Sequence, residues 1–139
     1  MVPDPERIIQ VRLWFDKANQ DLRAMGVDLA ANPPLVGDAA FHAQQAAEKA
    51  LKGFLTWHDK PFAKTHDLVA IGNACIEIDA TLASFVRDAG PLTEYAWRFR
   101  YPGEPETQIT PEQVRASELI ARKLHEAVLQ RLPPEVKPG

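Results

Sequence analysis

The stretch from residue 41 to residue 55, FHAQQAAEKALKGFL, leaves this chain few ways to fold. Placed on a helical wheel at about 100° per residue, its alanines share one broad arc with two aromatic residues. The arc consists of Ala43, Ala46, Ala47, Ala50, Phe54 and Trp57. Small side chains let neighbouring helices approach closely. We therefore expect this segment to be the central helix of a bundle, contacted on much of its circumference.

A second stripe of the same segment mixes polar and apolar groups, namely Phe41, Gln44, Gln45, Glu48, Leu51, Lys52 and Leu55. Three interpretations are open. The stripe is a solvated edge with a Glu48–Lys52 pair at the i,i+4 spacing, worth about 0.2–0.5 kcal/mol. Alternatively, it is a subunit interface in which Gln and Glu satisfy one another across a two-fold axis. The third interpretation is a groove facing a ligand or RNA, with Gln44, Glu48 and Lys52 as hydrogen-bonding groups.

Start and stop signals predict the other helices. The helical segments are expected from Asp4-Pro5 to about Met25, from Gly37-Asp38 to about His58, from Leu68 to Val86 as one bent helix or two short ones, from Leu92 to about Arg100, and from Thr110-Pro111 to Pro133-Pro134. The last of these has a capping box, with Gln113 at the third position. We expect an all-α, up-and-down bundle of four or five helices that forms one domain over residues 1–139.

Composition and spacing exclude several functional classes. A formal net charge of −3 argues against a generally basic nucleic-acid binder, so any contact with RNA would be local. The lone Cys75 lies on an apolar helix side and is expected to be a small buried hydrophobic residue. No metal-ligand spacing and no glycine-rich phosphate loop occurs, so neither a metal nor a cofactor is expected. With no signal peptide and no apolar run of about twenty residues, the chain is expected to be cytoplasmic and not to span a membrane.

Two segments carry further candidate residues. His66 lies in Thr65-His66-Asp67 at a helix start, where a capping cluster is the favoured interpretation. The alternative is a pairing with Arg100 across the bundle, either as a split Arg–His catalytic site or as a phosphate-binding pair.

Arg98 and Arg100 alternate with aromatic residues, Trp97, Phe99 and Tyr101. This pattern is typical of phosphate binding with base stacking, but it also fits core packing and a turn at Tyr101. We expect Trp97 in the core, and His42 and Lys49 in solvent.

Three motifs in order resemble the HEPN domain (higher eukaryotes and prokaryotes nucleotide-binding). They are Phe41-His42-Ala43-Gln44-Gln45-Ala46-Ala47-Glu48-Lys49-Ala50-Leu51-Lys52, then Thr65-His66-Asp67-Leu68, and then Leu92-Thr93-Glu94-Tyr95-Ala96 leading to Arg100-Tyr101-Pro102-Gly103. The resemblance implies a bundle like the substrate-binding domain of nucleotidyltransferases, commonly a homodimer. It also implies either one half of a toxin–antitoxin pair with a minimal nucleotidyltransferase or a metal-independent ribonuclease.

The sequence departs from the ribonuclease motif of that family, which is an Arg followed after four to six residues by a His. No Arg of this chain has a His at that spacing, including Arg98 and Arg100. We therefore expect a protein that binds a nucleotide, RNA or a partner nucleotidyltransferase and is not a standard ribonuclease of this family. The expected binding residues are Gln44, Glu48, Lys52, His66, Arg98, Arg100 and Tyr101. The alternatives are a ribonuclease toxin with a diverged site and a structural dimerisation module.

Overall fold

The computed structural model describes residues 4–99, 102 and 109–137, and these residues form helices and connecting turns. The elements in order are α1 (Pro5–Ala30), α2 (Val36–Trp57), α3 (Leu68–Ile78), η1 (Ala80–Leu82), α4 (Ala83–Ala89), η2 (Gly90–Ala96), α5 (Pro111–Gln130) and η4 (Pro134–Val136). The η elements are short 3₁₀ helices. Because the described residues contain no strand, the prediction of an all-α bundle is confirmed.

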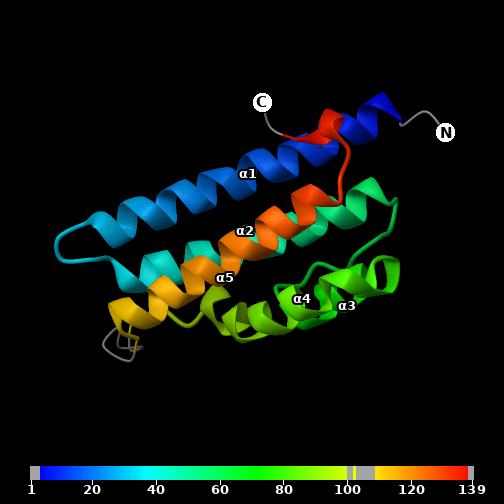
Figure 1. The fold of residues 1–139 in the computed structure, drawn as a ribbon. Coiled ribbons are helices and arrows are strands. Elements are labelled where there is room, and N and C mark those ends of the chain that lie inside the picture. The colour runs from blue at the N-terminus through cyan, green and yellow to red at the C-terminus, as the bar shows by residue number, and fades with distance from the viewer. Residues whose placement is uncertain (1–3, 100–101, 103–108, 138–139) are drawn as a thin grey trace.

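The central helix is α2, as its alanine arc predicted. It packs against α1, α3, α5 and η2, and Figure 1 shows it between α1 and the pair formed by α3 and α4. Ala43, Ala46, Ala47 and Ala50 are fully buried, and one hydrophobic cluster lies towards each end of the helix. A Cβ built on Gly53 would lie 2.7 Å from the Phe15 ring, so α1 and α2 are in direct contact there. Close packing on several sides of α2 leaves little of its surface for water.

The helix starts follow the local signals. Thr110 and Gln113 form the predicted capping box at α5, and Asp67 accepts backbone hydrogen bonds at the start of α3. At the other end of α1, the prediction of a stop near Met25 is wrong, because the helix continues through Gly26 to Ala30. A glycine inside a helix costs only about 1 kcal/mol relative to alanine, so the strong stop comes at the following Asn32-Pro33.

The predicted helical segment from Leu68 to Val86 is divided at Asp79. Its backbone is extended and its carboxylate accepts a hydrogen bond from the Thr81 amide, which ends α3 and begins η1. Of the two alternatives left open by the sequence, the structure therefore has two short helices, α3 and α4, with η1 between them. Further on, η2 is a 3₁₀ helix that ends at Ala96, short of the expected end near Arg100. The core position expected for Trp97 is wrong, because its side chain is half-exposed in the turn that follows η2.

Two other expectations concern Cys75 and membrane spans. Cys75 is fully buried, and burial raises the pKa of its thiol to about 12, as expected of a hydrophobic core cysteine. Among the helices of the described ranges, none combines the length and the apolar character that crossing a membrane requires.

Gly72 tests the contact between α3 and α4. A Cβ at this position would lie 2.2 Å from Val86 Cγ1, and the β-branched valine cannot move aside cheaply. Gly72→Ala should lower the free energy of unfolding by about 1–3 kcal/mol. The matched control is Gly26→Ala in α1, whose nearest neighbour would be Arg122 Nη2 at 3.7 Å. The control should raise stability by about 0.5–1 kcal/mol. Urea denaturation measures the free energy of unfolding of both variants. Equal effects would contradict the close contact between Gly72 and Val86.

Candidate functional site

The polar stripe of α2 lies inside the bundle. Gln44 is fully buried, and Glu48 and Lys52 are 4% and 9% exposed. Gln44 Nε2 donates to Glu48 Oε1 at 3.0 Å, and Lys52 Nζ donates to Glu48 Oε2 at 3.1 Å. The solvated-edge interpretation is therefore wrong. With His66, these residues form what we call the polar cluster.

Glu48 is the centre of the polar cluster. Both carboxylate oxygens accept hydrogen bonds, and the shortest distance is 2.7 Å, from His66 Nδ1. Burial alone would raise the pKa of Glu48, but hydrogen bonds from three neighbours and the charge of Lys52 outweigh it, so the pKa lies below the ordinary glutamate value. A lowered pKa means that ionised Glu48 stabilises the folded state. This stabilisation is present above the ordinary carboxyl pKa and is lost as the pH falls through the folded-state pKa.

Lys52 is held between a carboxylate and two aromatic rings. Its ammonium nitrogen lies 5.8 Å from the Trp14 ring centroid and 5.5 Å from that of Phe62. The two rings contact each other edge to face at 6.0 Å. Such cation–π contacts compensate part of the hydration that a buried ammonium loses. Lys52 therefore helps to hold the cluster together.

His66 is the member of the polar cluster that faces solvent, with 58% of its side chain exposed. Since the Glu48 carboxylate only accepts, the imidazole donates from Nδ1 and its Nε2 remains available for a ligand. The capping cluster predicted around it is present, because Thr65 accepts from the Asp67 amide and Asp67 caps α3. The sequence did not predict the hydrogen bond between His66 and Glu48.

The basic and aromatic segment lies after η2. Arg98 Nη1 donates to Glu94 Oε1 at 2.8 Å, and its guanidinium lies 5.1 Å from the Phe99 ring centroid. Arg100 and Tyr101, two of the predicted site residues, lie outside the described residues, as does the predicted pairing of Arg100 with His66. The preceding η2 contacts the start of α3, where Thr93 Oγ1 accepts a hydrogen bond from the Leu68 amide at 3.1 Å.

A second group of charged residues lies between α1 and α2. The expectation that His42 and Lys49 are solvated is wrong: His42 Nδ1 lies 2.8 Å from Asp21 Oδ1, and Lys49 Nζ lies 2.6 Å from Asp21 Oδ2. Asp21 is buried on α1, and the α2 side chains turn inward to meet it. Only the packing of the two helices could reveal this partner.

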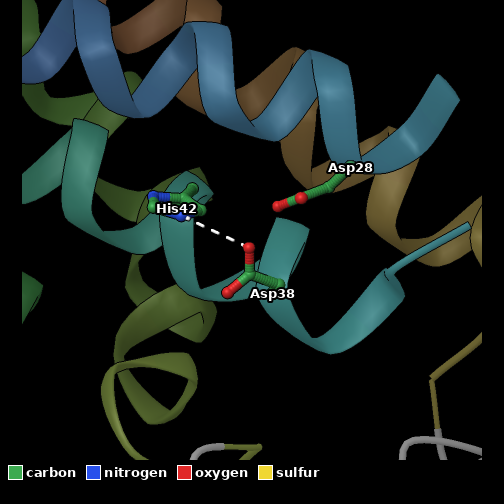
Figure 2. A group of neighbouring side chains, drawn as sticks. All are labelled: Asp28, Asp38 and His42. Carbon is green, nitrogen blue, oxygen red and sulfur yellow. Dashed lines mark ion pairs between the residues drawn. The ribbon is translucent and has the colours of Figure 1, made fainter. Parts of the chain in front are cut away.

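Asp28, Asp38 and His42 form the third group, which we call the Asp–His cluster. One donor atom from each lies within 4.8 Å of the other two, and Figure 2 shows the side chains converging from the two helices. Burial, followed by the hydrogen bond and charge of Asp38, raises the pKa of Asp28 to about 6, while His42 opposes the shift. Asp38 and His42 have the i,i+4 spacing of one helix face, the single signal that sequence offered.

Glu48 can be tested for its part in the buried cluster. Glu48→Leu leaves Lys52 buried without its carboxylate and should lower the free energy of unfolding by about 3–5 kcal/mol. Adding Lys52→Met removes the buried, unpaired ammonium and should restore much of the lost free energy of unfolding. The control is Glu118→Leu in the Glu118–Arg122 pair, which has the same i,i+4 spacing nearer the surface and should cost below about 1 kcal/mol. Equal costs for the two single variants in chemical denaturation would contradict a buried, coupled network.

Comparison with known proteins identifies the family of this chain. A sequence model of the HEPN domain matches residues 11–132, which begin in α1 and include the polar cluster and all of α5. Comparisons with curated proteins and with solved structures found no match. The match confirms the resemblance seen in the three motifs. Because the matched range is nearly the whole chain, this protein belongs to the HEPN domain family.

Proposed function

We propose that this HEPN-domain protein binds a phosphate-bearing ligand, a nucleotide or RNA, at the solvent side of the polar cluster. The observation that carries the proposal is the placement of His66. Its Nδ1 is anchored 2.7 Å from the buried Glu48, and its Nε2 has no hydrogen-bond partner among the described residues. A half-exposed imidazole held in one orientation by a buried carboxylate is suited to binding.

The chemistry follows from which groups are already engaged. Lys52 is committed to Glu48 and the two aromatic rings, so it does not reach a ligand. When the His66 ring is protonated, Nε2–H can donate to a phosphate oxygen while Nδ1–H stays on Glu48. Arg100 is proposed as a second phosphate contact, and the half-exposed Trp97 as a surface for base stacking.

Binding without cleavage is favoured over catalysis. The Arg and His at the spacing of the family's ribonuclease motif are missing from the whole sequence. General acid–base cleavage of RNA needs two groups placed at the 2′-OH and the leaving oxygen, and His66 supplies one. We accordingly propose a binding component, such as one half of a toxin–antitoxin pair with a minimal nucleotidyltransferase. A ribonuclease toxin with a diverged site is the outcome that cleavage would indicate.

Binding of a fluorescently labelled single-stranded RNA and of ATP tests the proposal. His66→Gln and Arg100→Ala should each weaken binding about tenfold, since one charge-assisted hydrogen bond contributes about 1.4 kcal/mol. Lys123→Ala removes an exposed cation on α5 and should leave the affinity unchanged. An unchanged Kd in His66→Gln would refute the proposed site.

The same samples report on cleavage. With EDTA present, we expect the RNA to remain intact in every variant. Cleavage that is lost in Arg100→Ala would replace the binding proposal with the ribonuclease alternative.

A second candidate function is association with another protein through α1. Ile9 and Leu13 are more than half exposed at the i,i+4 spacing. Beside them lies a depression of about 300 Å³, lined by Gln10, Leu13, Trp14 and Lys17. Exposed apolar residues beside a concave surface are typical of interaction sites. We propose a second copy of this chain as the occupant, with a nucleotidyltransferase as the other partner to test.

Solution mass tests the α1 surface. The wild type should have twice the mass of one chain, and Leu13→Arg should be monomeric, because an arginine at the interface would be desolvated without a partner. Leu119→Arg changes an equally exposed leucine on α5 and should remain dimeric. A monomeric wild type, or a dimer that tolerates Leu13→Arg, would contradict this surface. A stable dimer that binds neither RNA nor ATP would support the purely structural module instead.

A further inference from the structure

We propose that Asp28, Asp38 and His42 bind a divalent transition-metal ion, best represented by Zn²⁺, where the end of α1 meets the start of α2. This inference is independent of the proposed function, because the Asp–His cluster shares no residue with the polar cluster. Three features support the site: the geometry, a buried Asp28 oxygen without a hydrogen-bond partner among the described residues, and the hydrogen bond that orients His42.

The geometry brings three different ligand atoms together. Asp38 and His42 are one turn apart on α2, and Asp28 reaches them from α1, so the site depends on the packing of the two helices (Figure 2). Ligand atoms at about 2.1 Å from one Zn²⁺ lie about 3–4 Å apart. The observed atoms lie within 4.8 Å of one another, so small side-chain rotations would bring them onto one ion.

Asp28 supplies the second observation. The residue is 7% exposed, its Oδ2 is buried without a hydrogen-bond partner in the described part of the chain, and its carboxylate points into the cluster. A buried carboxylate oxygen without a donor is costly, and binding a cation compensates that cost. Asp38 offers another carboxylate at the same place.

The orientation of His42 favours a metal ligand. Its Nδ1 lies 2.8 Å from the carboxylate of Asp21, which only accepts, so a ring hydrogen is on Nδ1; whenever the ring is neutral, its lone pair is on Nε2. That Nε2 lies 3.4 Å from Asp38 Oδ2. Two carboxylates and an imidazole nitrogen therefore meet at one place, where a cation or a proton is stabilised between them. Histidines that bind metals typically donate their other N–H to a carboxylate, and here Asp21 is itself held by Lys49 at 2.6 Å.

The donor set selects the class of ion. Imidazole with two carboxylates suits Zn²⁺, Mn²⁺ and related ions, whereas Mg²⁺ and Ca²⁺ prefer oxygen ligands alone. Three protein ligands also leave a coordination position for water or for an oxygen of another molecule. The competing account is a proton shared among the same three side chains.

Calorimetric titration of the chelator-treated full chain with Zn²⁺ at pH 7.5, in a buffer free of phosphate, tests the site. We expect one ion per chain, with a Kd in the micromolar range and an affinity for Mg²⁺ at least tenfold weaker. A hundredfold excess over Kd should raise Tm by roughly 5–10 °C. Co²⁺ should show visible absorption bands that change in His42→Gln.

Three variants give the test its specificity. Asp28→Asn and Asp38→Asn should each weaken Zn²⁺ binding at least tenfold. Without metal, Asp28→Asn should be as stable as the wild type or more stable, because it removes a buried anion, so its loss of binding would not be due to unfolding. His66→Gln, which changes the polar cluster only, should bind Zn²⁺ as the wild type does. No saturable binding below 1 mM, or binding that survives both Asp variants, would overturn the proposal in favour of the shared proton.

Discussion

The structure depends on how closely the other helices pack around α2. The small side chains of Ala43, Ala46, Ala47 and Ala50 allow close approach, so α1, α5 and α3 pack against α2 from different sides. Positions that would be solvated on a peripheral helix therefore become buried, including those of Gln44, Glu48 and Lys52. A buried charge is tolerated only when its hydrogen-bonding groups find partners inside the protein. Both clusters described above are consequences of this close packing.

The two clusters meet that requirement to different degrees. In the polar cluster, the Glu48 carboxylate is balanced by Lys52 and by hydrogen bonds from Gln44 and His66. Among the described residues, the groups of the polar cluster satisfy one another, and the His66 ring is the part of the cluster that faces solvent. In the Asp–His cluster, two carboxylates lie close to the Nε2 atom of His42, and a buried oxygen of Asp28 has no donor among the described residues. The first arrangement presents one group to solvent, while the second calls for a positive ion or proton.

Membership of the HEPN family does not by itself determine what this chain does, because one bundle can carry different sites. The family's ribonuclease motif is absent from the sequence, and the histidine nearest the solvent side of the polar cluster comes from the loop before α3. That histidine is oriented by a glutamate of α2, an arrangement that differs from an Arg–His pair. The family suggests a nucleotide- or RNA-related function, and the residues of this site distinguish this chain within the family.

Local signals determined much of the fold in advance. The alanine arc identified the central helix, and the Thr110 capping box and Asp67 cap marked two helix starts, because these depend on residues within one or two turns. The three motifs likewise identified the family from sequence. The tertiary structure decided which polar residues are buried and which residues pair. The partners lie on different segments of the chain, as in the pairs Asp21 and His42, Glu48 and His66, and Lys52 and Trp14. Helical periodicity gives the face of a side chain on its own helix, but the burial and charge of that face are set by the helix packed against it.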